Sequence, residues 1–297
     1  MTQFLQALIN GVSLAAIYAL VAVGFVIIFK STQVLNFAQP ALLLLGALWV
    51  TYFTTVTGLP FWLSLVIAVL LSAATGMAVE RTALRPMVGK PIFAVAIMTI
   101  GLNTVLTVLA LAGLGIDIRP IGDPWGLRVL RFGEFVIAHR QIAGIVAAVV
   151  LILLLLAFFK YTRMGLAMRA AAFDQEVALT QGVSVAAVFA VSWALSAVLA
   201  MFGGVFIGAG VGIDRTASVV ALKALPVVIV GGLDSIGGAL VGALIIGVAE
   251  VLTSTYQPTL APGLGRNFAQ VVPYLVMFIV LLVRPYGLFG TKEVERV

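Results

Sequence analysis

The chain has 297 residues, of which 63% are hydrophobic and only 9% are charged. A soluble domain needs roughly a quarter charged residues, so the sequence predicts an integral membrane protein. Its apolar runs are continuous rather than alternating, which excludes outer-membrane strands and leaves helices. The net charge of +6 fits basic loops beside a membrane, so we infer no nucleic-acid binding. The absence of cysteine excludes disulfides and cysteine metal sites.

The expected fold is all-α and polytopic, a single transmembrane domain over residues 1–297 with about eight to nine spans. The start, MTQFLQALINGVSL, has no basic leader region and continues as a long apolar run, so we expect a retained first span with its N-terminus outside. The piece at 219–233 is too short for a perpendicular span and is expected to be tilted, broken or re-entrant. Apolar windows place the segments at 4–29, 37–52, 61–79, 92–114, 142–159, 185–211, 219–233, 237–255 and 268–283.

If the piece at 219–233 crosses, an outside N-terminus gives a cytoplasmic C-terminus. The charges support this orientation, because basic residues collect in cytoplasmic loops. The inside then holds Lys30, Arg81, Arg85, Lys90, Lys160, Arg163, Arg169, Arg284, Lys292 and Arg296. The outside holds Arg119, Arg128, Arg131, Arg140, Arg215 and Arg266. An external loop at about 115–141 is the longest hydrophilic connection, and the alternating stretch 127–136 is compatible with a small hairpin. The two halves are only weakly similar: each has a glycine-bearing apolar helix next to a polar break, without a clear repeat.

The segment 164–182 is the longest polar interruption in the second half. It is rich in alanine, lacks proline and ends near Gly182, which predicts a short helix with a left-handed cap. We interpret it as a surface helix on which a partner protein pushes. The alternative, an ordinary solvated basic loop, is common beside membranes.

Polar residues at membrane depth are costly and tend to be functional. Asn36 and Gln39 lie with Pro40 in the break between the first two spans, and Thr99 and Asn103 share one face of the fourth. These four side chains either line a solute path or serve as an interfacial turn and a helix contact.

Two charged residues fall within apolar segments of the second half. Glu250 lies well inside its span, and Lys223 lies in the short piece. The two either form an intramembrane pair, or Lys223 extends its amine to the interface.

Small residues predict close helix packing in two places. In the sixth span Ser196, Ala200, Gly204, Gly208 and Gly212 recur every four residues. The segment GGLDSIGGALVG, which includes Gly238 and Gly242, indicates either a tight turn with a helix interface or a hinge at a substrate path.

Motifs for chemistry are missing from the sequence. There is no GxxxxGK[ST] phosphate loop, and His139 is the single histidine. No Ser, His and Asp set or carboxylate pair falls in a plausible common pocket. We therefore expect neither an enzyme nor a metal site.

Four stretches resemble the permease subunits of branched-chain amino-acid-type ABC importers. They are GVSLAAIYALVAVGFVIIF followed by VLNFAQPALLLLGA, then GLAMRAAAFDQEVALTQGV, then LKALPVVIVGGLDSIGGALVGALIIGVAE, and finally RPYGLFG. The matches arrive in order over nearly the whole chain, although Gln39 and Pro40 replace the His and Gly frequent in the family. The external loop has no match.

The resemblance implies a heterodimer-forming permease in the cell (inner) membrane, with a second homologous permease, two cytoplasmic ATP-binding subunits and an external solute-binding protein as partners. ATP would be bound by those partner subunits, with no cofactor in this chain. The resemblance also implies a substrate path near Asn36, Gln39, Thr99, Asn103 and Glu250. It assigns ATPase coupling to Gly165, Arg169, Ala170, Ala171, Asp174, Glu176 and Gly182. The competing hypothesis is an ion-coupled secondary transporter or channel that uses Glu250, Asp234 and Lys223.

Overall fold

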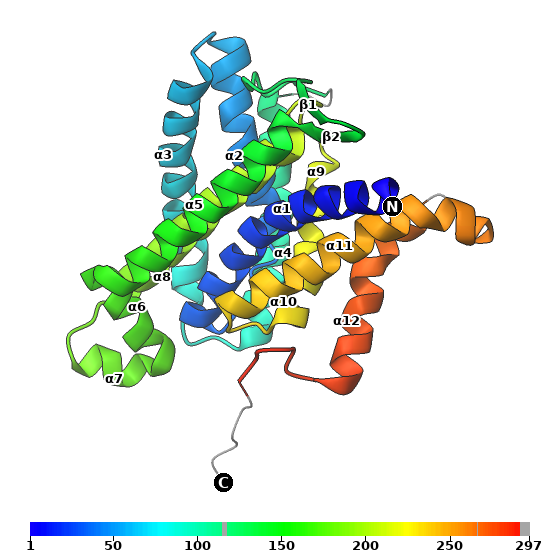
Figure 1. Ribbon diagram of the computed structural model, residues 1–297. Coiled ribbons are helices and arrows are strands. Elements are labelled where there is room, and N and C mark those ends of the chain that lie inside the picture. Colours follow the sequence, from blue (N-terminus) through cyan, green and yellow to red (C-terminus); the bar gives the residue numbers. More distant parts are fainter. Residues whose placement is uncertain (115–117, 266, 292–297) are drawn as a thin grey trace.

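The computed structural model describes residues 1–114, 118–265 and 267–291, and it is a bundle of membrane-length helices (Figure 1). Residues 115–117 of the expected external loop lie outside this part, as do Arg266, Lys292 and Arg296. Over the described residues, seven helical segments are long and apolar enough to cross a membrane: Thr2–Thr32, Gln39–Val56, Phe61–Met87, Ile92–Gly113, His139–Tyr161, Val185–Gly208 and Ile236–Leu260. Two shorter apolar segments, Ala217–Gly231 and Phe268–Val283, complete the set.

The helices follow the predicted order, with irregular turns at several ends. The first half contains α1 (Thr2–Thr32), α2 (Gln39–Thr51) with a π-helical turn (Tyr52–Val56), α3 (Phe61–Val79) with a π turn and a 3-10 turn up to Met87, and α4 (Ile92–Leu114). A hairpin follows, with β1 (Val129–Phe132) paired antiparallel to β2 (Phe135–Ala138), as the alternating stretch indicated. The second half contains α5 (His139–Tyr161), α6 (Arg163–Phe173), α7 (Gln175–Thr180), α8 (Val185–Gly208), α9 (Ala217–Leu222), α10 (Ala224–Gly231), α11 (Ile236–Leu260) and α12 (Val272–Val283).

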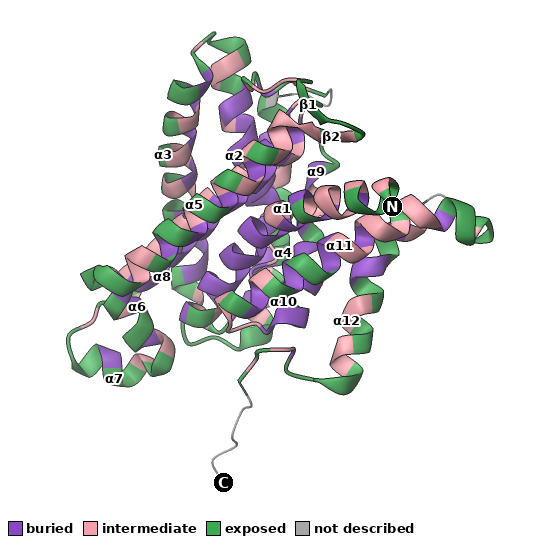
Figure 2. Cartoon of the chain, in the orientation of Figure 1, coloured by how far each residue is buried: buried purple, intermediate pink, exposed green. Residues whose placement is uncertain are grey.

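Helix α1 forms the centre of the bundle. Every residue from Tyr18 to Ile28 is buried, whereas α3, α4 and α5 expose apolar faces (Figure 2). Helix α8 runs antiparallel to α1, because Gly24 faces Ser196 while Gly203 faces Val21. In a membrane, the exposed faces of the outer helices meet lipid, and the buried α1 positions whatever binds inside.

The two halves repeat one packing scheme, which the sequence shows only faintly. In the first half α2 packs on α8, α3 and α4, and α3 packs on α8. In the second half α10 packs on α1, α11 and α12, and α11 packs on α1. With α1 and α8 antiparallel, this exchange of roles is the arrangement of an inverted repeat, in which binding sites form at discontinuous helices.

Two predicted elements differ in detail, and a third has the predicted break. The surface helix at 164–182 is two helices, because Asp174 is extended (φ −157°) and its carboxylate caps the second, α7. The sixth span ends at Gly208 rather than Val211, since Gly210 and Gly212 have positive φ. The short piece at 219–233 is broken, as expected, into α9 and α10.

Candidate functional site

The break between α1 and α2 is held by two fully buried polar side chains. Asn36 Oδ1 accepts from the Ala38 N–H at 2.9 Å, and its amide donates to Gln39 Oε1 at 3.1 Å. Both residues are at most 1% exposed. Burying two amides is favourable only with their hydrogen bonds made, so the network fixes the shape of the break.

Gln39 connects this break to both central helices. Its Oε1 accepts from the Ser196 hydroxyl of α8 at 2.8 Å, and the same hydroxyl lies 2.9 Å from the Gly24 carbonyl of α1. Gly24 leaves room for this contact, because an added Cβ would overlap the Gln39 amide. The predicted small-residue position Ser196 is thus a polar anchor as well as a packing surface.

The polar side chains of α4 accept hydrogen bonds from backbone N–H groups at the start of α2 and just before it. Thr99 Oγ1 accepts from the Phe37 N–H and Asn103 Oδ1 from the Ala41 N–H, each at 3.1 Å. The first N–H groups of a helix have no partner within it, so these two side chains satisfy donors that would otherwise be unpaired. Asn36, Gln39, Thr99 and Asn103, predicted from separate stretches, therefore come together at one site.

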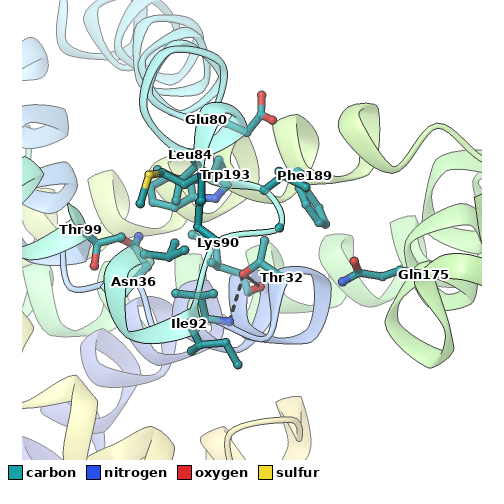
Figure 3. Close-up of a pocket in the computed structure, with 16 residues that line it drawn as sticks. Thr32, Asn36, Glu80, Leu84, Lys90, Ile92, Thr99, Gln175, Phe189 and Trp193 are labelled. Carbon is teal, nitrogen blue, oxygen red and sulfur yellow. Dashed lines mark hydrogen bonds between the residues drawn. The ribbon is translucent and has the colours of Figure 1, made fainter. Parts of the chain in front are cut away.

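A cavity of about 130 Å³ adjoins the break (Figure 3). Asn36 and Thr99 lie on one side of it, and Gln175 from α7 lies on the other (Figure 3). Gln39, Asn103 and Glu250 are not among its lining residues. Its wall consists of Ile28, Thr32, Val34, Asn36, Glu80, Leu84, Met87, Val88, Gly89, Lys90, Ile92, Val95, Thr99, Gln175, Phe189 and Trp193. The wall is mainly apolar with a few polar groups, which suits a small amphipathic solute.

Glu250 lies in a separate buried cluster. Lys223, at the junction of α9 and α10, forms an ion pair with it, and the Tyr18 hydroxyl of α1 donates to Glu250 Oε2 at 2.6 Å. Lys223 therefore forms the intramembrane pair rather than extending to the interface. The cluster attaches the α9–α10 junction, the second break, to α1. Gln39 and Ser196 hold the first break, the turn between α1 and α2, in a similar way.

Helices α6 and α7 follow α5 directly, and we call the pair the coupling bracket. The backbone of Gly165 packs directly on Phe158 and Phe159, where a side chain would overlap main-chain atoms. Asp174 Oδ1 accepts from the N–H groups of Glu176 and Val177 at 2.9 and 3.0 Å. Gln175 then donates to the Ser31 carbonyl at the end of α1 at 3.0 Å.

The residues of this bracket divide between its two faces. Arg169, Ala170, Asp174, Glu176 and Gly182 are exposed, whereas Gly165 and Ala171 are buried. The outer face also exposes apolar side chains, above all Phe173 at 96%, with Val177 and Leu179. Gly182 has φ +81° and ends α7 as predicted.

Three of the predicted packing glycines, Gly204, Gly238 and Gly242, lie in close helix contacts, whereas Gly208 packs on the connection between α4 and β1 and Gly212 lies in a turn. A Cβ on Gly204 would lie 2.7 Å from the Leu43 carbonyl of α2, and one on Gly208 would overlap Ile121. Gly242 lies against the Val227 carbonyl of α10. Gly212 lies outside α8 in a turn with φ +89°, so the predicted ridge ends at Gly208.

Sequence reasoning did not predict where the closing RPYGLFG segment binds. Leu288 and Phe289 donate their N–H groups to the carbonyls of Val230 and Gly231 at 2.8 and 3.0 Å. A side chain on Gly238 would overlap the Gly231 carbonyl and reach Phe289. The closing segment and the segment GGLDSIGGALVG are therefore in direct contact, an arrangement consistent with the tight turn and helix interface.

The described part of the connection between α4 and α5 makes contacts that the sequence did not predict. Asp123 accepts from the N–H groups of Gly210 and Gly126, and Arg140 donates to the Ala209 carbonyl at 2.8 Å. These contacts satisfy backbone groups where α8 ends. The alternating stretch and the basic residues gave no signal of them, because the partners are distant in sequence.

For the described residues, no group of three or more His, Cys, Asp or Glu side chains is arranged to hold a metal ion. The polar groups that line the cavity are the amides of Asn36 and Gln175, the hydroxyls of Thr32 and Thr99, and the charged side chains of Glu80 and Lys90. Such an arrangement is suited to binding a solute.

The fold and the site define a polytopic α-helical membrane protein with a polar turn between α1 and α2 and a broken short helix at α9 and α10. Residues 7–281 match the family model described as branched-chain amino acid transport system, permease component. The chain therefore belongs to this family of transport permeases, multi-pass proteins of the cell (inner) membrane.

Named relatives match over almost their whole length. The high-affinity branched-chain amino acid transport system permease protein LivH of Escherichia coli is 31% identical, over 99% of this chain and 98% of the relative. The permease protein BraD of Pseudomonas aeruginosa is 27% identical with the same coverage. The solved structure of PsaBC from Streptococcus pneumoniae in complex with Fab has TM-score 0.52 and 13% identity, covering 96% of this chain and 94% of that one. That likeness shows the fold alone.

Proposed function

We propose that this chain is the membrane-spanning permease subunit of an ATP-driven importer for branched-chain or related amino acids, and that it forms half of the translocation path. The observation that carries the proposal is the Asn36, Gln39, Thr99 and Asn103 network at the turn between α1 and α2, beside a mainly apolar cavity with a few polar side chains. Full-length family membership supports the substrate class. Glu250 acts on the path indirectly, by fixing the second break.

The bracket of α6 and α7, about residues 164–182, is the proposed coupling element. Its inner residues Gly165 and Ala171 are buried, and Gln175 links it to α1. Arg169, Ala170, Asp174, Glu176 and Gly182 lie on its exposed surface with the apolar Phe173, which suits a groove of an ATPase subunit. ATP-driven closure of two such subunits would move α1 and its break as one body.

The proposed assembly contains a second homologous permease, two ATP-binding subunits and an external solute-binding protein. In this assembly residues 1–297 form one permease domain, without a catalytic site or cofactor of its own. The N-terminus and the external loop at about 115–141 lie outside, and the C-terminus lies inside. This topology requires that both short apolar segments, Ala217–Gly231 and Phe268–Val283, complete crossings, for nine spans.

The test is uptake of labelled leucine into proteoliposomes that contain the chain, its co-purified subunits and the binding protein. We expect uptake only with ATP and all subunits present, and no response to an ion gradient. Uptake by the chain alone, driven by an ion gradient, would instead establish the secondary transporter. The separation of Asp234, bonded to Thr291, from the buried Lys223 and Glu250 pair argues against one shared ion site.

A further inference from the structure

A second cavity, of about 310 Å³, lies between α1, α5, α6 and α11, at the end of the bundle that carries α6 and α7 (Figure 1). One part of its wall is apolar and comes from spanning helices: Ile27, Leu156, Phe159 and Ile236. Lys30 and Arg169 provide the charged part. The cavity therefore offers a hydrocarbon surface and two cations to a single occupant.

The charge of this cavity is uniformly positive. Lys30 and Arg169 are exposed, and the lining includes no acidic side chain. Within the described residues, the ion pairs are Glu80 with Arg85 and Lys223 with Glu250, so neither cation of the cavity takes part. An anion entering here meets two donors without displacing an internal partner.

The position of the lining residues along the spanning helices indicates which kind of anion fits the cavity. Leu156 and Phe159 are in the last turns of α5, and Ile27 precedes the end of α1. In the proposed topology these positions are where spanning helices leave the hydrocarbon, which would put Lys30 and Arg169 at headgroup level. A free phosphate would leave the apolar wall in contact with water, whereas a phospholipid covers both parts.

We propose that this cavity binds an anionic phospholipid, with its phosphate between Lys30 and Arg169 and an acyl chain along Ile27 and Leu156. The proposal rests on the proposed function for the cytoplasmic location of this end and for the coupling role of α6. Basic pockets between helices on that side suit anionic headgroups. Bound there, the lipid joins α6 to α1 and stiffens the connection between the coupling bracket and the first break.

The experiment measures lipid retention by the purified chain alone. The chain in mild detergent is incubated with phosphatidylglycerol or phosphatidylcholine, and bound lipid is counted by native mass spectrometry. We expect preferential retention of phosphatidylglycerol, reduced about fivefold by Lys30→Gln and again by Arg169→Gln, since each basic residue contributes ~1 kcal/mol. Arg163→Gln is the matched control, because Arg163 is on α6 but does not line the cavity.

A second variant tests the apolar part without changing charge. Ala172 lines the cavity and is half-buried, so Ala172→Phe fills it and should also lower retention. Equal retention of both lipids, or loss of phosphatidylglycerol to excess inorganic phosphate, would overturn the lipid assignment. Normal retention of phosphatidylglycerol by Lys30→Gln, Arg169→Gln and Ala172→Phe would also overturn it. Because no ATP or substrate is present, this test fails or succeeds independently of the transport assay.

Discussion

Lys223 and Glu250 form an ion pair inside the bundle, although one lies at a helix break and the other in the middle of α11. Tyr18 completes the cluster from α1. Removing one charged partner leaves the other buried and uncompensated, which is more costly than losing the pair itself.

We therefore expect Lys223→Met or Glu250→Leu to lower stability by about 3–5 kcal/mol, and the double variant to recover much of that loss. Thermal unfolding followed by size-exclusion chromatography measures the effect. Tyr18→Phe, which removes one hydrogen bond to a charged group, should cost only ~1.5–3 kcal/mol. A double variant as unstable as the worse single one would contradict this account.

A second prediction concerns the link between α4 and α2. Asn103→Leu leaves the Ala41 N–H without its acceptor, so we expect a loss of ~1–3 kcal/mol and slower transport. Asn103→Asp retains the acceptor oxygen and should be milder. Thr104→Val is the control, because Thr104 is exposed and its hydroxyl bonds only within its own helix. If Thr104→Val and Asn103→Leu behaved alike, the hydrogen bond to α2 would be unimportant.

The coupling bracket offers a pair of adjacent alanines with opposite environments. Ala170→Trp places bulk on the exposed face and should weaken ATPase binding about tenfold or more, with folding retained. Ala171 is 2% exposed, so Ala171→Trp overpacks the interior and should cost ~1–3 kcal/mol of stability. Subunit pull-down and thermal unfolding distinguish the two. Normal assembly and uptake by Ala170→Trp would remove this face from the coupling model.

Two adjacent glycines test the contact between the late motifs. Gly238→Ala brings a Cβ onto the Gly231 carbonyl and should destabilise the chain by ~1–3 kcal/mol. A Cβ on Gly237 has no atom within 4 Å, so Gly237→Ala should be neutral or stabilise by up to ~1 kcal/mol. The melting temperatures of the two purified variants test this prediction. Equal shifts would argue against a close contact between Gly238 and Gly231.

The sequence predicted the helical membrane class, the hairpin and the polar residues of the first break. Thr99 and Asn103 could be recognised as a stripe, but their partners, the N–H groups of Phe37 and Ala41, lie far away in the chain. For the same reason, the hydrogen bond from the Leu288 N–H to the Val230 carbonyl could not be predicted, because the two residues are far apart in the sequence. Such pairings depend on how helices are arranged, which periodicity does not specify.

Local signals were available for two of the differences. Asp174 belongs to the residue types that favour an N-cap, and its preference outweighed the helix propensity of the neighbouring alanines. Gly212 follows the spacing of the predicted packing ridge but adopts a positive φ, as does Gly210, because the chain after α8 turns to pair with Arg119 at Ile213. Spacing alone does not distinguish a glycine that packs a helix from one that ends it.

Tyr18 and Gly24 lie within about two turns of each other on α1. Tyr18 donates to Glu250 of the buried ion pair, and Gly24 lies against the Gln39 amide and the Ser196 hydroxyl. One short stretch of α1 therefore contacts both polar clusters, so we expect a bulky substitution within it to disturb the two together.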